Sequence, residues 1–186
     1  MGGLFTTLSF LTTTGFESSG WEDARAWAGL GTPGLILSGL AIIGGGIATT
    51  AGGVRLLRVY ALIRHGEREL DLLLYPSSVG GGGQAARRLR RKGAFVAWIF
   101  FMLFAISIAV VMVAISYTGL DFDPAMIFTI AALSNTGPLT AVAGDFPLAW
   151  GDLSTAAKAI LAGAMVLGRL ETLAIIALFN PELWRK

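Results

Sequence analysis

Two short stretches of this sequence place hydroxyl residues directly before a glycine, a combination suited to cation binding. Residues 11–16 read Leu-Thr-Thr-Thr-Gly-Phe, and residues 133–138, which lie 122 positions further on, read Leu-Ser-Asn-Thr-Gly-Pro. Glycine relaxes the backbone, so that successive carbonyl oxygens can turn toward one axis and replace a cation's hydration shell. These stretches, called here the first loop and the second loop, predict a cation pathway.

Each loop follows a short apolar segment that must position it. Residues 2–10 and 125–132 are too short to cross a bilayer, which takes about 20 apolar residues. A short helix that ends at hydroxyl residues and a glycine is typical of a re-entrant pore loop, and its partially negative C-terminal end would point at the ion. The repeat therefore predicts two pore helices, each followed by a filter-like turn.

The composition indicates an integral membrane protein. Of the 186 residues, 54% are hydrophobic and 14% are charged, whereas soluble domains carry about a quarter charged residues. Residues 94–118 contain no formal charge and are long enough to cross a hydrocarbon core of about 30 Å. The N-terminus looks like neither a secretory leader nor a complete span. Zero cysteines and a single histidine exclude disulfides and a thiolate or histidine metal cluster.

Positive charge is concentrated in one connection of the chain. Nine of the fourteen Lys and Arg residues lie within residues 55–92, whereas residues 119–153 contain four Asp and no Lys or Arg. By the positive-inside rule, the basic connection and the C-terminus are cytoplasmic, and both loops lie toward the outer face. The basic run at residues 87–92 is interpreted as a topology anchor beside anionic lipid, with docking of a cytoplasmic regulator as the alternative. Its juxtamembrane position argues against nucleic-acid binding.

A glycine-rich segment, residues 44–53, is expected to interrupt the span that starts near Pro33. It contains five glycines, and each costs roughly 1 kcal/mol relative to Ala inside a helix, so the helix should break and resume at Val54. Irregular backbone at membrane depth is tolerated only inside protein or beside water. The segment predicts an intramembrane gate under the loops, with close glycine packing between helices as the alternative.

Three expectations concern the remaining elements. Residues 17–31 are expected to form a solvated loop that carries acidic residues, and His65-Gly66 to end the resumed helix. A final span from about residue 156 to 179 could be capped by Asp152, Ser154 or Thr155, with Ala159 and Gly163 as a small-residue face for close helix contact.

Arg169 is an ionisable residue within that last span. Such a group normally faces a cavity or a partner, because exposure to lipid costs a few kcal/mol or more. We expect Arg169 to be buried, where it sets an electrostatic barrier in the pathway or holds the glycine-rich segment by its carbonyls. Snorkelling to the inner headgroups is the alternative.

Taken in this order, the features resemble the Trk/Ktr/HKT superfamily of potassium transporters, and most of all the C-terminal half of a TrkH-type subunit. The two loops, residues 44–55, Gly168-Arg169-Leu170-Glu171 and residues 179–185 carry the resemblance. It implies an all-α integral membrane fold of helix/pore-loop/helix repeats with re-entrant pore helices, as in potassium channels, of which this chain holds a partial set. We expect a pore loop with a broken second helix in residues 1–64, a cytoplasmic linker in 65–93 and a complete repeat in 94–186.

The resemblance further implies potassium uptake through the bacterial cytoplasmic membrane, without enzymatic activity. Potassium would bind at backbone carbonyls of Thr13, Thr14, Gly15, Asn135, Thr136 and Gly137. The implied gate residues are Gly45, Thr49, Thr50, Gly52 and Arg169. The implied partners are membrane lipid, a second copy in a homodimer and a cytoplasmic TrkA-type nucleotide-binding subunit, with no organic cofactor on this chain.

The resemblance leaves the number of filter strands incomplete, because two strands cannot enclose an ion. The chain is then a fragment, or two copies combine, or a separate chain supplies the rest. A competing hypothesis is a non-conducting regulatory or scaffold membrane subunit that recruits a partner through residues 87–92.

Overall fold

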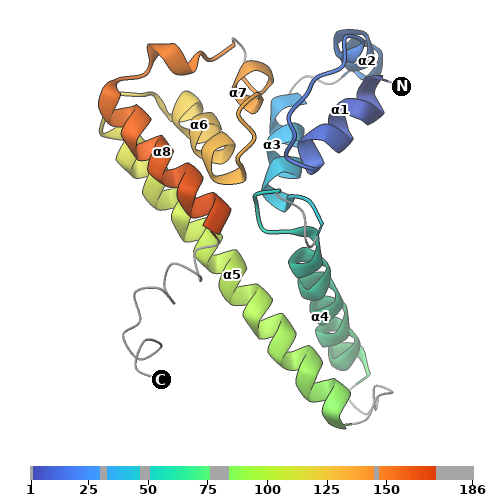
Figure 1. Cartoon of the computed structure of the whole chain (residues 1–186). Coiled ribbons are helices and arrows are strands. Elements are labelled where there is room, and N and C mark those ends of the chain that lie inside the picture. The colour runs from blue at the N-terminus through green and yellow to red at the C-terminus, as the bar shows by residue number, and fades with distance from the viewer. Residues whose placement is uncertain (1, 30–32, 47–50, 76–83, 145–146, 171–186) are drawn as a thin grey trace.

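The computed structural model describes residues 2–29, 33–46, 51–75, 84–144 and 147–170. Within these ranges the regular structure is helical throughout, which confirms the expected all-α class. The helices are α1 (Gly2–Leu11), α2 (Trp21–Ala28), α3 (Pro33–Ile43), α4 (Leu56–Leu74), α5 (Gln84–Ser116), α6 (Phe122–Ser134), α7 (Leu139–Val142), a 3-10 turn η1 (Trp150–Asp152) and α8 (Thr155–Leu170). Figure 1 shows the short helices gathered at one end, with α4 and the start of α5 extending away from them.

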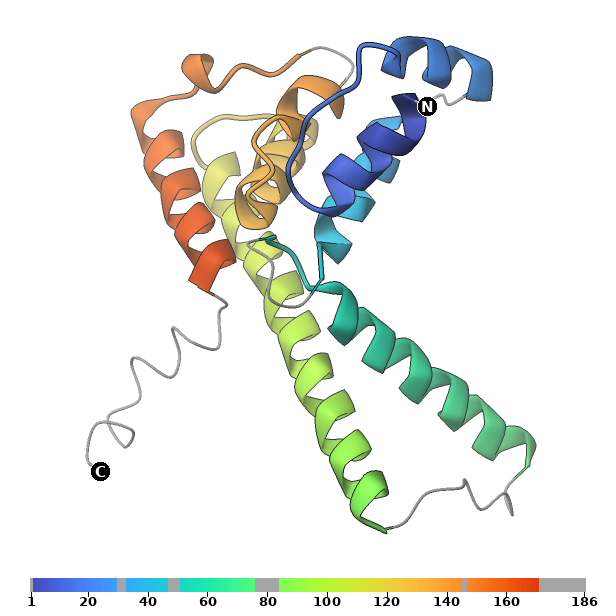
Figure 2. The same cartoon turned by 45° about the vertical axis from the view of Figure 1, so that its right-hand side comes forward.

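Helix α5 is the one described helix that is both long and apolar enough to span a membrane. Its 33 residues correspond to about 50 Å, well over the roughly 30 Å of a hydrocarbon core. The apolar part is Gly93–Ser116, with a mean hydropathy of 2.8, in agreement with the span expected at residues 94–118. The remaining turns of α5 precede this part, carry the basic run and extend away from the short helices (Figures 1 and 2).

One hydrophobic core joins α5, α6 and α8. Ser154, one of the three expected caps, caps α8, because its Oγ accepts a hydrogen bond from the Ala157 backbone N–H at 3.2 Å. The expected contact face of α8 is wrong, however, since Ala159 and Gly163 are exposed. The helix packs instead through a stripe spaced at helical intervals, Ala157, Leu161, Ala164 and Gly168, of which the first three are at most 1% exposed.

A second core joins the two halves of the chain. Phe10 of α1 and Leu37 of α3 are fully buried with Ile130 of α6 and Leu139 of α7. Helix α6 contributes to both cores, and nine of its 13 residues are buried. A helix that is apolar all round belongs in the interior, so the composition of α6 explains its central place in Figure 1.

Two expected boundaries are wrong. Helix α4 runs through His65-Gly66 to Leu74, because one interior glycine costs only about 1 kcal/mol and the Arg64 guanidinium donates to Glu67 across it at 2.9 Å. Residues 17–31 contain helix α2, which is held by Trp21, only 4% exposed in the second core. The expected limits at 64/65 and 93/94 therefore fall inside α4 and α5, and the division into three parts stays a prediction.

Candidate functional site

The two loops begin with the same helix-ending turn. In the first loop, Thr13 has φ +56°, the Thr13 N–H donates to the Phe10 carbonyl at 3.1 Å and the Thr14 N–H to the Ser9 carbonyl at 2.9 Å. In the second loop, Asn135 also has φ +56°, with matching bonds from its own N–H to Ala132 (3.1 Å) and from the Thr136 N–H to Ala131 (2.9 Å). Both are Schellman motifs, so the 122-residue repeat extends to the backbone conformation.

The loops lie side by side. Gly15 has φ +82°, and a methyl group on its Cα would lie 2.9 Å from Pro138 Cδ and 3.2 Å from Thr136 Cγ2. Gly137, the matching glycine, faces open space, since no described atom comes within 4 Å of such a methyl group. This position requires glycine for two reasons: its φ is positive, and a side chain would collide with Pro138 of the second loop.

The side chains of the loops are tied to their surroundings by hydrogen bonds. Thr13 Oγ1 accepts from the Gly52 N–H at 3.2 Å in a buried position, and Asn135 Nδ2 donates to the Met165 carbonyl of α8, also at 3.2 Å. Thr136 is fully buried, with its hydroxyl 3.1 Å from that of Ser134. The bonds of Thr13 and Asn135 were not predicted, because they join residues 39 and 30 positions apart in the sequence.

The carbonyl groups of the two loops differ in their availability. In the second loop, the Thr136 carbonyl accepts from the Leu139 N–H (3.1 Å), and the Gly137 carbonyl accepts from both the N–H (3.3 Å) and Oγ1 (3.2 Å) of Thr140. In the first loop, the Thr13, Thr14 and Gly15 carbonyls accept no hydrogen bond from any described residue. The start of α7 therefore hydrogen-bonds to carbonyls of the second loop, whereas the three carbonyl oxygens of the first loop remain available as ligands.

The glycine-rich segment breaks the helix as predicted and folds back on the end of α3. Gly44 (φ +73°) and Gly53 (φ +80°) make the turns, and the Val54 N–H donates to the Ile42 carbonyl at 2.8 Å. Gly44 lies directly against the Gly52 carbonyl, and Gly52 directly against that of Ser134. The structure thus places Gly52 in a buried position next to the loops. Gly45 is also buried, and its carbonyl accepts from the Leu56 N–H at 3.1 Å, whereas Thr49 and Thr50 lie outside the described residues.

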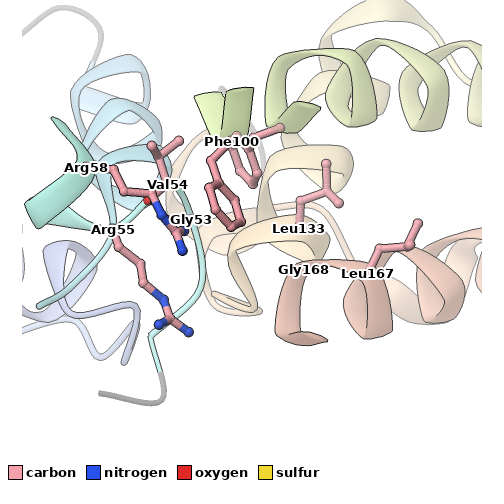
Figure 3. Close-up of a pocket in the computed structure, with 9 residues that line it drawn as sticks. Gly53, Val54, Arg55, Arg58, Phe100, Leu133, Leu167 and Gly168 are labelled. Carbon is pink, nitrogen blue, oxygen red and sulfur yellow. Dashed lines mark hydrogen bonds between the residues drawn. The ribbon is translucent and has the colours of Figure 1, made fainter. Parts of the chain in front are cut away.

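A small cavity of about 20 Å³, room for roughly one water molecule, adjoins the segment. Figure 3 shows Gly53, Val54, Arg55 and Arg58 on one side of it and Leu133, Leu167 and Gly168 on the other. The Arg58 guanidinium stacks over the Phe100 ring at 3.6 Å, which joins α4 to α5.

The expectation that Arg169 is buried is wrong, because its side chain is exposed. The packing stripe of α8 ends at the half-buried Gly168, which lies directly against the Leu133 carbonyl. Arg169 follows one position later, about 100° around the helix, and so leaves that stripe. Gly168 lines the cavity beside the glycine-rich segment. The backbone of Arg169 therefore lies close to that cavity.

Comparisons with known proteins match the chain throughout its length. A family model described as "TrkH: Cation transport protein" matches residues 1–186. The Trk system potassium uptake protein TrkH of Escherichia coli (strain K12) is 36% identical over 183 residues, which cover 98% of this chain and 36% of the relative. The Trk system potassium uptake protein TrkG of the same strain is 31% identical over 186 residues, covering 97% and 36%.

A solved structure agrees with the fold. The crystal structure of the potassium transporter TrkH from Vibrio parahaemolyticus matches with a TM-score of 0.77 at 31% identity, over 99% of this chain and 38% of that one. Fold and comparisons agree on a helical protein of a cation-transport family. The chain belongs to the TrkH family of cation transport proteins. It spans about a third of the length of these relatives, whose names describe potassium uptake and no enzymatic reaction, as expected.

Proposed function

We propose that this chain forms part of a pathway for potassium uptake across the bacterial cytoplasmic membrane, with potassium bound by backbone carbonyls of the two loops. The observation that carries the proposal is the contact between Gly15 and the second loop, at the ends of two helices that close with the same turn. Helices α1 and α6 both end there, so the partial negative charge of two helix C-termini favours a cation at one place.

The proposed ligands are the carbonyls of both loops: Thr13, Thr14, Gly15, Asn135, Thr136 and Gly137. The first loop supplies the more available oxygens, because its carbonyls accept no hydrogen bond from the described residues. The Thr136 carbonyl keeps one lone pair beside its bond from Leu139. The Gly137 carbonyl already accepts two hydrogen bonds from Thr140. It therefore binds an ion only when at least one of these bonds at the start of α7 breaks.

The proposed gate is the glycine-rich segment, with Gly52 at the loops and Gly45, Thr49 and Thr50 as its further members. Direct contact between Gly52 and Ser134 supports this role, since it brings the segment against the start of the second loop. Arg169, at the exposed end of α8, is proposed to act as an electrostatic barrier to cations that have passed the segment.

The proposed partners are membrane lipid, a second copy in a homodimer and a cytoplasmic TrkA-type regulatory subunit. Support comes from α5, which carries the basic run at residues 87–92 as a helix that continues beyond its apolar part. A helical basic end offers a fixed surface for anionic headgroups or a regulator, on the side of the chain away from the loops (Figure 2).

Rubidium uptake with sodium as competitor tests the proposal, in cells without potassium transporters of their own that express the protein with or without Gly137→Ala. A methyl group at Gly137 meets no described atom, so the variant should fold and insert normally. We expect saturable uptake that resists sodium, and loss of uptake or of sodium discrimination in the variant.

Unchanged uptake and discrimination in the inserted variant would contradict the proposal. The scaffold hypothesis predicts the opposite pattern, in which reversing the charges of residues 87–92 abolishes function and the glycine variant stays active. Expression alone and together with the remaining length found in the relatives separates a self-sufficient chain from one that needs further repeats.

A further inference from the structure

The matching residues Thr13 and Asn135 tie their loops to different parts of the molecule. The Thr13 hydroxyl accepts from the Gly52 N–H in the glycine-rich segment. The Asn135 amide donates to the Met165 carbonyl in α8, a helix that packs on α6 through a continuous buried stripe. One loop is therefore bonded to the glycine-rich segment and the other to a packed helix.

Gly52 contacts the second loop as well as the first. A methyl group on its Cα would collide with the Ser134 carbonyl group, so the two backbones touch. Thr13 is 8% exposed and Ser134 is fully buried, and Gly52 itself is buried. A buried N–H that loses its acceptor pays a desolvation cost, so the Gly52 bond to Thr13 opposes displacement of the segment.

We propose that Gly52 and the Thr13 hydroxyl form a latch that couples the position of the glycine-rich segment to the shape of both loops. Because the same residue bonds to Thr13 and packs on Ser134, the segment cannot leave without releasing both loops. The consequence for transport rests on the proposed function: moving the segment changes the geometry of the cation ligands in the same step. Thr13 then acts through its hydroxyl as a positioning residue, besides the role proposed for its carbonyl.

Thiol labelling measures the latch without transport. Ala51 is 7% exposed beside Gly52, and the chain contains no cysteine, so Ala51→Cys reports whether the segment is in place. Thr13→Val removes the acceptor at nearly constant shape, and Thr13→Ser keeps it. We expect Thr13→Val to raise the rate of modification by a small methanethiosulfonate in membrane vesicles about two- to tenfold, the equivalent of one buried hydrogen bond. Thr13→Ser should leave the rate within about twofold.

Two controls separate the latch from general loosening. Asn135→Ala breaks the bond to α8 and leaves the Thr13 bond to Gly52 in place, so it should raise the labelling rate less than Thr13→Val does. Gly52→Ala should raise the rate because its methyl group meets Ser134, whereas Gly46→Ala, in the same segment, meets no described atom and should not. If Thr13→Val fails to insert into the membrane, the comparison of Gly52→Ala with Gly46→Ala still tests the latch.

The same variants in the rubidium uptake assay give the second readout. Thr13→Val should increase the share of sodium in the flux, and Thr13→Ser should not. Equal labelling rates in Thr13→Val and Thr13→Ser, or in Gly52→Ala and Gly46→Ala, would overturn the latch. If the unaltered protein transports neither rubidium nor sodium, the proposed function is wrong. The labelling rates then still show whether the latch exists.

Discussion

At the scale of residues, Thr13 and Asn135 hold one backbone conformation with side chains that are not equally suited to it. Asn adopts left-handed dihedral angles readily, whereas a β-branched residue with φ +56° is a genuine outlier. The Thr13 hydroxyl bond to Gly52 offsets part of this cost. The strained Thr13 agrees with a first loop whose conformation depends on the glycine-rich segment. The unstrained Asn135 agrees with a second loop whose conformation does not depend on that segment.

Gly15→Ala tests whether the contact between the loops is needed for folding. An alanine at φ +82° costs about 1–2 kcal/mol, and its methyl group 2.9 Å from Pro138 adds an overpacking cost of about 1–3 kcal/mol. Gly29→Ala is the matched control, because Gly29 has φ +60° and open space around it. Thermal unfolding in detergent should show a clearly larger loss for Gly15→Ala. Equal losses would mean that the loops do not need their close approach.

At the scale of elements, the position of α8 depends on a stripe of small residues that lets it approach α6. Gly168 lies directly against the Leu133 carbonyl, at the point where α6 turns into the second loop. A side chain there would push the end of α8 away from this turn and from the cavity that Leu167 and Gly168 line. The packing of one helix thus supports the backbone that is proposed to bind the ion.

We expect Gly168→Ala to lower the free energy of unfolding by about 1–3 kcal/mol through overpacking. Gly163→Ala, in the same helix, has no described neighbour within 4 Å and should be neutral or slightly stabilising, since Ala is the better helix former. Chemical or thermal unfolding of the two variants in the same detergent measures the difference. Loss of stability in Gly163→Ala instead would show that the exposed face of α8 is a contact face after all.

Much of the element order could be predicted from the sequence. Pro33, the glycines from Gly44 onward and the bounds of α1 all act through local backbone preferences, which the sequence displays directly. Helix α2 was missed because it depends on burial of Trp21 against residues far away in the chain. The candidate site was predicted as residue types, but the bond from Gly52 to Thr13 and the packing stripe of α8 are tertiary contacts that no local pattern shows.

At the scale of the whole molecule, the chain has an end with two loops and an end with a long helix pair. Helix α4 and the start of α5 both extend away from the short helices and diverge from each other (Figures 1 and 2). The Arg58 contact with Phe100 joins them close to the glycine-rich segment. The basic run lies at the start of α5, before its apolar part, whereas the second loop begins beside Phe100 and Phe104, which are inside that part.

Single cysteines test the proposed orientation in intact cells. Tyr117, directly after the apolar part of α5, is 88% exposed, and Leu73, near the end of α4, is 79% exposed. By the positive-inside rule, a membrane-impermeant maleimide should label Tyr117→Cys from outside and Leu73→Cys only after the cells are permeabilised. The reverse pattern would invert the orientation and place the loops toward the cytoplasm.

The contact between α3 and α6 also determines how the chain can associate. It is heterologous, because different helices meet: Ile130 of α6 and Leu37 of α3 belong to the second core, and Met126 of α6 packs against that core. The positions 122 residues earlier, Leu4 and Leu8 of α1, are 69% and 59% exposed in this chain. When units associate by heterologous contacts, an open arrangement always leaves one contact face of the terminal unit uncovered. Only a closed ring of units covers every such face.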